Sequence, residues 1–314
     1  MDPLSIKTFL APIYEAARPV YNEASRLVHY TSAENGLKIL SSRSIWMRNT
    51  TCMNDYMEIE HGRRALSEAW RSEAGQEVKD LINTMHNDSA SKIERLFDLW
   101  APIFSSDTYI SCLSIHDESE NEFGRLSMWR AYGASSGVAL VLNPEPFRVQ
   151  SSGGGIYSTP VIYATQSELN HEFHKFSQRL SKYHDYVSSL TEDELVQRVF
   201  NLFRMLVISL KHPGFCEERE WRVYCQPRFE KAPPMQKEIE TIGGVPQHVG
   251  KLKLVSSPAN GLHGIELTSL LERIIIGPTE HAHMIQLAYV EALEQLGFSD
   301  PASKVVLSNI PLRN

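Results

Sequence analysis

The chain has 314 residues, of which 42% are hydrophobic and 22% charged, and its formal net charge at pH 7 is −7. These values are typical of a globular protein with a substantial core, and they argue against broad duplex binding, which requires many basic side chains. The four cysteines form no Cys-x-x-Cys pair, and the chain has neither a basic-then-apolar leader nor a membrane-length apolar run. We therefore expect reduced cysteines, a cytoplasmic location and no membrane partner.

The first half of the chain predicts alternating helices and strands. Residues 1–25 have the apolar spacing of a helical lead-in. The next expected elements are a strand over 27–30, a helix over 33–40, a strand over 44–48, a helix from 58 to about 72, a polar helical segment over 75–100, a strand over 108–114, an acidic loop over 117–122, a helical turn over 126–132 and a buried strand over 137–142.

The second half contains a helical insertion and more strands. The expected elements are a strand over 160–163, two helices within 168–210 with the second starting at Thr191, a strand over 220–225, a polar hairpin after the prolines at 233–234, a strand over 271–276, a helix over 281–296 and a strand over 305–308. We expect a single domain over residues 1–314, with a mixed sheet and helices inserted between its strands.

His29 lies at the end of the first predicted strand, directly before a helix start signal. Thr31 and Glu34 have the spacing of a capping box, in which Thr31 caps the helix and Glu34 reaches back. Because helix N-termini bind anions, His29 is positioned to meet a phosphorylated ligand. A packed strand histidine with a local partner is the more common outcome for such a residue.

The segment 220–225 predicts a half-buried strand with Glu220 and Arg222 on one face and Trp221 on the other. The Trp221 face suits the core, so the Glu220 face is expected to line either solvent or a cleft. In a cleft, the Glu220 carboxylate would bind a ribose hydroxyl and stabilise a developing cation. A solvated ion pair of little energetic value is the simpler interpretation.

Other candidate residues have similar alternatives. Trp129 and Tyr132, three residues apart, could stack on a planar ring or pack in the core. Asn54 and Asp55, followed by Glu58, predict a turn and a helix cap. The sequence has no zinc-protease helix, phosphate loop, nucleophile elbow, Rossmann glycine pattern or kinase signature, which disfavours most familiar enzyme superfamilies.

Taken in order, the short motifs resemble a bacterial family of unknown function, domain-of-unknown-function family twenty-nine seventy-one, over about residues 26–312. They are His29-Tyr30-Thr31, Ile39-Leu40, Ile45-Trp46, Asn54-Asp55-x-x-Glu58, Ser111-Cys112-x-Ser114, Met128-Trp129-x-x-Tyr132-Gly133, Glu218-x-Glu220-Trp221-Arg222 and Ile276-Gly277-Pro278. No single motif is specific, and the resemblance rests on the ordered set.

The opening His29-Tyr30-Thr31, followed by a helix and Ile39-Leu40, also resembles ADP-ribosyltransferases, especially DNA-modifying toxins of the DarT type. This resemblance implies an α+β fold with an ADP-ribosyltransferase-like mixed split sheet and helical insertions. It implies NAD as the substrate, no metal, and catalytic roles for His29, Tyr132 and Glu220, with Tyr30 as the alternative aromatic residue. The NAD-binding set that we expect is His29, Tyr30, Thr31, Arg48, Asn54, Asp55, Trp129 and Arg222.

This chain departs from those toxins in two ways. A long helical insertion, 168–210, precedes the strand that carries Glu220, and the Ser-Thr-Ser strand of the arginine-type enzymes is absent. The expected function is NAD-dependent transfer of ADP-ribose to a macromolecule, nucleic acid or protein, in toxin–antitoxin or anti-phage defence, with an antitoxin or defence-system partner. The open alternatives are an NAD glycohydrolase, a non-catalytic nucleotide-sensing or interaction module, and a nuclease that uses Asp55, Glu58 and the acids of 117–122.

Overall fold

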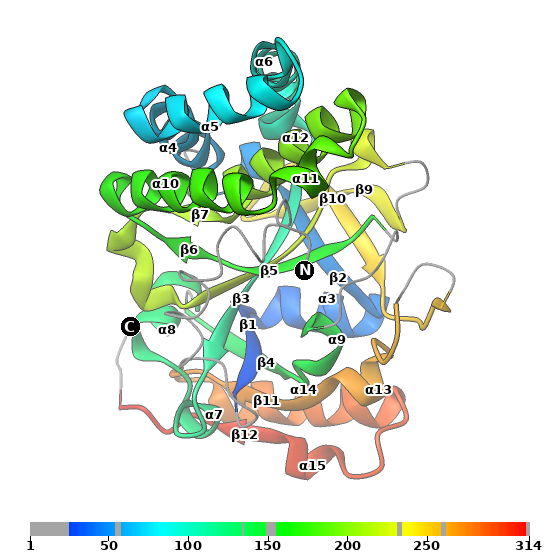
Figure 1. The fold of residues 1–314 in the computed structure, drawn as a ribbon. Helices are drawn as coiled ribbons and strands as arrows, with labels where there is room; N and C mark the ends of the chain where they lie inside the picture. Colours follow the sequence, from blue (N-terminus) through cyan, green and yellow to red (C-terminus); the bar gives the residue numbers. More distant parts are fainter. Residues whose placement is uncertain are drawn as a thin grey trace. The chain divides into compact units, whose positions relative to one another are not determined.

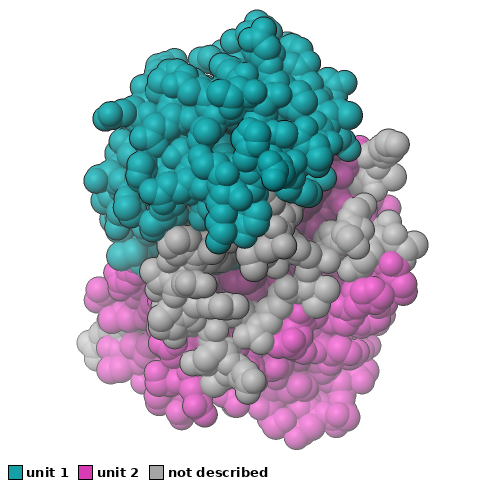
Figure 2. Space-filling model, in the orientation of Figure 1, with its two compact units in different colours: residues 1–19, 50–108, 160–216 teal, residues 20–49, 109–159, 217–314 magenta. Residues whose placement is uncertain are grey.

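The computed structural model describes residues 25–53, 58–133, 135–148, 155–230, 234–258 and 262–311. The chain divides into two compact units, coloured in Figure 2. Unit 1 comprises residues 1–19, 50–108 and 160–216, and unit 2 comprises 20–49, 109–159 and 217–314. The predicted helical lead-in and the predicted site residues Asn54 and Asp55 lie outside the described residues, apart from Ser25 at the end of the lead-in.

Unit 1 is built mainly from helices (Figure 1). They are α4 (Glu58–Arg71), α5 (Glu73–Met85), α6 (Ser89–Ser106), α10 (Gln166–Lys182), α11 (His184–Ser188) and α12 (Glu192–Ser209), together with the short turn η2 (Thr50–Cys52) and the parallel strand pair β6 (Ile162–Tyr163) and β7 (Leu210–Lys211). An aromatic cluster fills the space between these helices: Trp70 meets Phe203 edge to face, with ring centroids 5.1 Å apart.

Local capping explains where several helices of unit 1 begin. Thr191 and Glu194 form the capping box that the sequence predicts, and Thr165 and Glu168 form a second one. The predicted polar helical segment over 75–100 is wrong as a single element, because α5 ends before His86 and α6 begins after Asp88. Asp88 takes the left-handed conformation with φ 63°, which interrupts the helix at that point.

Unit 2 is organised around a mixed ten-stranded sheet. Its main path has the order β12-β11-β4-β1-β3-β2-β10-β9, and β8 pairs with both β3 and β5. The strands are β1 (Arg26–Ser32), β2 (Ser44–Asn49), β3 (Tyr109–His116), β4 (Gly137–Leu142), β5 (Tyr157–Pro160), β8 (Glu220–Cys225), β9 (Met235–Ile242), β10 (Val245–Lys253), β11 (Leu271–Ile276) and β12 (Val305–Leu307). The mixed sheet is therefore confirmed.

Two core clusters lie on the two faces of this sheet. The larger cluster packs beneath α3 (Ala33–Ser42) and α14 (Ala282–Gln295), and it includes Leu40, Ile274 and Tyr289. The smaller cluster lies beneath α8 (Leu126–Tyr132) and includes Tyr30 and Trp129. The remaining short elements of unit 2 are α7 (Glu120–Phe123), α9 (Glu145–Arg148), α13 (Leu267–Leu270), α15 (Pro301–Lys304) and η4 (Pro227–Phe229), while η3 (Pro213–Glu218) lies where the chain passes from unit 1 to unit 2.

The sheet is split at β3. Ser114 pairs with Val28 of β1 on one edge and with Glu220 of β8 on the other, so β1 and β8 flank β3. Ile110 likewise pairs with Arg48 of β2 and with β8. Strands β1 and β2 therefore share one edge of β3 and pair with its opposite ends, which leaves residues 111–113 between them on that edge.

The first helix begins at Ala33, as predicted, but its N-cap lies one residue later than predicted. Its N-cap is Ser32, whose Oγ accepts a hydrogen bond from the Asn35 backbone N–H at 3.2 Å. Thr31 lies one residue before this N-cap, within β1, where it pairs with Val138. The predicted capping box is therefore wrong, and the Glu34 carboxylate instead pairs with Lys38 at 2.7 Å.

Among the described residues, no helix combines the length and apolar character needed to cross a bilayer. The four cysteines are free thiols, of which Cys225 is buried and Cys216 exposed.

Candidate functional site

Glu220 and Arg222 form a buried ion pair on β8. The Nε of Arg222 donates to one carboxylate oxygen of Glu220 at 2.7 Å, and an Nη donates to the other at 3.2 Å. Glu220 is 4% exposed and Arg222 is fully buried. The prediction of a half-buried strand is wrong, since all six residues of β8 are buried. β3 and β5 pair with the two edges of β8. Its two faces are also covered: Trp221 and Val223 pack in the larger core cluster, and the Glu220–Arg222 pair is buried on the other face.

His29 lies at the split in the sheet. Its Nδ1 donates a hydrogen bond to the backbone carbonyl of Cys112 at 3.0 Å, in the stretch of β3 that neither β1 nor β2 pairs with on this edge. Burial lowers the pKa of His29, an effect that the bond to the Cys112 carbonyl partly opposes. The imidazole is therefore neutral at physiological pH, with Nδ1 as donor and Nε2 as a hydrogen-bond acceptor.

Tyr30 and Trp129 pack together in the smaller core. Their ring centroids are 4.8 Å apart in an edge-to-face arrangement, and the exposed fractions are 6% and 3%. The indole Nε1 of Trp129 donates to the Phe123 carbonyl at 3.0 Å. Neither ring has an exposed face on which a ligand could stack. Of the two interpretations of Trp129, stacking on a ligand or packing in the core, the structure supports packing in the core.

Tyr132 is the predicted aromatic residue with an accessible ring. It lies at the end of α8 with 36% of its surface exposed, and its hydroxyl donates to the Glu218 carboxylate at 3.4 Å. Arg48 is half-buried on β2, where its Nε donates to the Gln247 side-chain carbonyl at 3.1 Å. Thr31 is half-buried in β1.

The strand register decides which predicted residues share a face. Directly paired residues of an antiparallel sheet point to the same side, so Val28, Ser114 and Glu220 share one face. Tyr30 belongs to this face because it is two residues from Val28, whereas His29 points to the other face. The structure thus brings Tyr30 and Glu220 to one face and places His29 at the split.

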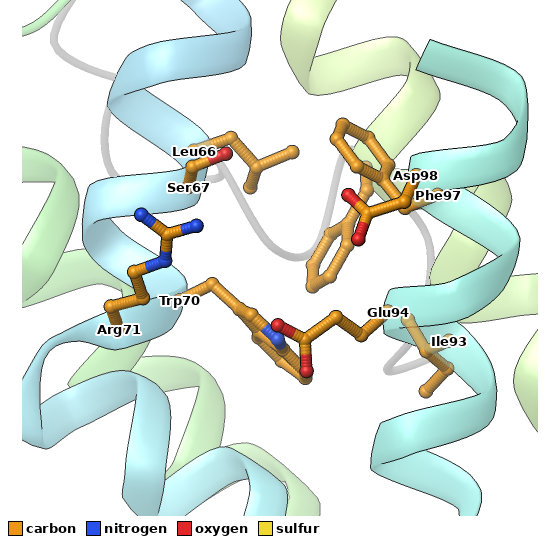
Figure 3. Close-up of a pocket in the computed structure, with 9 residues that line it drawn as sticks. Leu66, Ser67, Trp70, Arg71, Ile93, Glu94, Phe97 and Asp98 are labelled. Atoms are coloured by element: carbon orange, nitrogen blue, oxygen red, sulfur yellow. The ribbon is translucent and has the colours of Figure 1, made fainter.

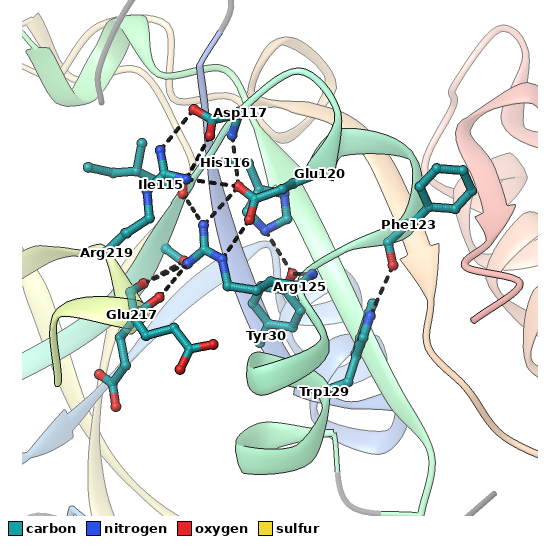
Figure 4. Close-up of polar contacts among 12 residues, drawn as sticks. Tyr30, Ile115, His116, Asp117, Glu120, Phe123, Arg125, Trp129, Glu217 and Arg219 are labelled. Carbon is teal, nitrogen blue, oxygen red and sulfur yellow. Dashed lines mark hydrogen bonds and ion pairs between the residues drawn. The ribbon is translucent and has the colours of Figure 1, made fainter. Parts of the chain in front are cut away.

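Sequence reasoning did not identify the polar network centred on Arg125 (Figure 4). This guanidinium binds both oxygens of Glu120, at 2.6 and 2.8 Å, and donates to the Ser114 hydroxyl at 2.8 Å. It also donates to three backbone carbonyls, those of Ile115, Glu217 and Glu218. Arg125 therefore joins α7, β3 and the segment before β8.

Two arginines hold Asp117 and Glu120 of the acidic segment 117–122. Arg219 binds Asp117 through two bonds of 2.8 Å and reaches Glu120 at 3.2 Å. Its bonds lower the pKa of Asp117. Burial is the largest single influence on the pKa of Glu120 and would raise it, but the hydrogen bonds from Arg125 and the Asp117 N–H, together with the charge of Arg125, lower the pKa overall. The sequence did contain a signal for this network. Arg125 follows the acidic residues 117–122, and Arg219 directly precedes the predicted strand 220–225.

His116 completes the network beneath these charges. The Arg125 backbone N–H donates to the Tyr30 hydroxyl at 2.6 Å, and this hydroxyl lies 2.7 Å from His116 Nε2. The Tyr30 hydroxyl thus accepts a hydrogen bond from Arg125 and donates its own O–H to His116 Nε2. Burial lowers the pKa of His116 to about 4, and the positive charges of Arg125 and Arg219 act in the same direction.

Unit 2 also contains a polar cavity of about 910 Å³. Its lining includes Arg26, Asn121, Val141, Arg273, Gln286 and Val306. Arg273 donates to the Asn121 carbonyl at 3.1 Å, and Arg26 is ion-paired with Glu272 at 2.5 Å. None of the residues predicted to be catalytic lines this cavity. Among the described residues, no group of three His, Cys, Asp or Glu side chains is arranged to hold a metal ion.

A family model described as a protein of unknown function (DUF2971) matches residues 128–223. The matched span runs from α8 to β8 and includes Trp129, Tyr132, Glu220 and Arg222. The match supports the resemblance to that family over this part of the chain, while the motif at His29 lies outside it. Comparisons with curated proteins and with solved structures gave no significant match.

Proposed function

We propose that this chain cleaves NAD and transfers ADP-ribose to a macromolecular acceptor. The observation that carries the proposal is the Glu220 carboxylate, fixed by Arg222 on a strand adjacent to the split in the sheet. An oriented, desolvated carboxylate stabilises positive charge that develops near it more strongly than one in water does.

The proposed chemistry breaks the bond between the nicotinamide nitrogen and the ribose carbon. The bonding electron pair leaves with nicotinamide, positive charge grows on the ribose, and an acceptor nucleophile forms the new bond and loses its proton. Glu220 would accept a hydrogen bond from the hydroxyl of that ribose and stabilise the cation-like transition state. Tyr132 would stack on nicotinamide, since its ring is accessible.

His29 would bind the ribose on the adenine side. Its neutral Nε2 is an acceptor that suits a ribose hydroxyl, because Nδ1 is already committed to the Cys112 carbonyl. Since His29 and Glu220 point to opposite faces, the proposal requires an extended dinucleotide that lies across the split. The split sheet, in which β1 and β2 diverge from one edge of β3, supports an ADP-ribosyltransferase-like arrangement.

The experiment is nicotinamide release from NAD by the purified full chain, with and without crude lysate. Glu220→Gln is expected to lower the rate by about 10²–10³-fold, the usual effect of losing one electrostatic stabiliser. Glu291→Gln, an exposed carboxylate on α14, is the matched control and should leave the rate unchanged. Full activity in Glu220→Gln would sink the assignment.

Two further measurements sharpen this test. Tyr132→Ala removes an exposed ring, so it should raise the KM for NAD while leaving the melting temperature unchanged. This variant keeps the proposal testable if Glu220→Gln fails to fold, since Arg222 would then be buried without its partner. Release that does not depend on lysate, with no labelled macromolecule, would indicate an NAD glycohydrolase instead of a transferase.

A second candidate function, a non-catalytic nucleotide-binding module, is favoured by the polar cavity. Its volume of about 910 Å³ is within the range of small-molecule sites, about 300–1,000 Å³. Arg273 provides a guanidinium that suits phosphate, while the carboxylates of Glu118, Glu122 and Glu272 in the same lining oppose an anion. This candidate predicts calorimetric NAD binding without nicotinamide release, weakened by Arg273→Gln and not by Tyr132→Ala.

A further inference from the structure

A small pit opens between three helices of unit 1 (Figure 3). Its walls are Leu66 and Trp70 of α4, Ile93 and Phe97 of α6, and Phe203 of α12. The pit has a volume of about 30 Å³, whereas one water molecule needs roughly 10–15 Å³ on the same measure. The walls are apolar, and the pit is large enough for a small aliphatic group.

The indole of Trp70, which lines the pit, has one polar atom without a hydrogen-bond partner. Trp70 is 6% exposed, and its Nε1 is buried with no hydrogen-bond acceptor among the described residues. The ammonium of Lys79 lies 5.0 Å from the ring centroid, and Phe203 meets the ring edge to face. These contacts involve the ring and do not satisfy the N–H. A buried donor without an acceptor is costly, so the site favours a ligand that supplies one.

Three exposed charged side chains line the mouth of the pit: Arg71 of α4, and Glu94 and Asp98 of α6. Within the described part of the chain, none of them has an ion-pair partner within 4.0 Å, although Arg63 acts on Asp98 at longer range. Glu94 and Asp98 are four residues apart on one helix face, where like charges repel. The mouth thus offers two carboxylates and, on the neighbouring helix, one guanidinium.

From these observations we infer that the pit is a binding site for a small zwitterionic ligand, a free amino acid with an aliphatic side chain. Its carboxylate would accept hydrogen bonds from Arg71 and from Trp70 Nε1. Its ammonium would bind Glu94 and Asp98, and its side chain would enter the apolar pit. This ligand class satisfies the buried N–H and all three unpaired charges at once.

The test is calorimetric titration of the full chain with L-valine. Isobutylamine, which lacks the carboxylate, and isovalerate, which lacks the ammonium, are the paired probes, and each is expected to bind at least about tenfold more weakly than L-valine. Absence of binding by L-valine would overturn the proposal. So would equal binding by isobutylamine, which would indicate a site for organic cations alone.

Variants assign the binding to this pit. Trp70→Phe keeps an aromatic wall but removes the N–H, and it should weaken L-valine binding about tenfold. Glu94→Gln and Arg71→Gln change exposed side chains, so they carry the test if Trp70→Phe does not fold. Glu73→Gln on α5 is the matched control and should bind as the wild type does. Unchanged binding in both Glu94→Gln and Arg71→Gln would contradict the assignment, whatever the outcome for NAD.

Discussion

At the residue scale, Arg125 joins β3 and α7, which lie within 11 residues of it, to the segment before β8, which lies 92 or 93 residues later in the chain. Its side chain is 9% exposed, and its bonds reach Glu120, Ser114 and the carbonyls of residues 115, 217 and 218. A buried cation with such complete bonding is stable. Removing it would take two hydrogen bonds from Glu120, which would keep those from Arg219 and the Asp117 N–H, and would take a donor from three backbone carbonyls.

Arg125→Met is therefore expected to lower the free energy of unfolding by about 3–5 kcal/mol, the usual cost of breaking a buried ion pair by removing one partner. Arg130→Met on the same helix changes an exposed arginine and should cost less than about 0.5 kcal/mol. Urea denaturation of both variants measures the difference. An equal effect of the two substitutions would mean that the network around Arg125 contributes little stability.

His116 predicts a pH dependence of stability. Its pKa is lowered from 6.5 to about 4 in the folded chain, so the unfolded chain binds the proton more tightly. The stability contributed by neutral His116 is fully present above pH 6.5 and is lost as the pH falls from 6.5 to 4. The loss is about 3 kcal/mol at most.

His116→Gln keeps an acceptor for the Tyr30 hydroxyl but does not titrate, so its stability should fall less between pH 7 and about 4.5. The free energy of unfolding of both proteins, measured across this range, gives the comparison, with His283→Gln on the exposed face of α14 as the control. Asp117, whose pKa is lowered from 3.8, loses its contribution only at lower pH. His29, whose pKa is also lowered from 6.5, acts in this window but equally in both proteins, so the difference between them reports His116. Parallel curves for wild type and His116→Gln would contradict the assignment.

At the scale of single elements, α3 ends in a strained residue. Its C-cap, Arg43, has φ 45° and ψ 49°, the left-handed conformation that glycine adopts without cost. The chain needs this conformation because the Arg43 N–H bonds back to the carbonyls of Ile39 and Leu40, while its own carbonyl accepts from Leu254 N–H at 2.8 Å.

Arg43→Gly is expected to raise the free energy of unfolding by about 0.5–1 kcal/mol, since it removes the strain and keeps the backbone bonds. Ser41→Gly, two residues earlier within the helix, should lower it by a similar amount because glycine there only adds backbone entropy to the unfolded state. The melting temperatures of the two variants, measured by thermal unfolding, should therefore shift in opposite directions from that of the wild type.

Helices and strands with a strong local apolar pattern were predicted most accurately. The boundaries predicted for 126–132, 137–142, 220–225 and 271–276 are those of α8, β4, β8 and β11, because continuous or alternating apolar runs define them without tertiary information. The N-cap at Ser32 and the helix break at Asp88 were not predicted. Both depend on the backbone conformation at the end of an element, which the apolar pattern does not show. Local sequence could not show that β5 would pair with β8 or that both faces of β8 would be buried.

The candidate site was less predictable than the fold for the same reason. The register that places Tyr30 with Glu220, and His29 at the split, arises from pairing between strands more than 80 residues apart. The Arg125 network likewise joins residues 114 and 125 to the carbonyls of 217 and 218. Such long-range partners leave no periodic signal in one sequence.

At the scale of the whole molecule, each unit has its own core and its own closely packed glycine. In unit 1, a Cβ on Gly62 of α4 would lie 2.1 Å from the Val207 carbonyl oxygen of α12. In unit 2, a Cβ on Gly36 of α3 would lie 2.2 Å from the Tyr289 hydroxyl of α14. Alanine at position 62 forces the backbones of α4 and α12 apart, and alanine at position 36 displaces the buried Tyr289 side chain. Overpacking of this kind typically costs about 1–3 kcal/mol.

Because each contact lies within one unit, the two substitutions should loosen different parts of the chain. Gly62→Ala is expected to increase hydrogen exchange in α4 and α12 and to leave β4 protected, whereas Gly36→Ala should expose α3, α14 and β4 and spare α12. Glu68→Ala on the exposed face of α4 is the control for the substitution itself. If each glycine variant instead increased exchange equally across both units, the chain would unfold as one cooperative domain. In that case a local destabilisation lowers the free energy of the single unfolding transition through which every helix and strand exchanges.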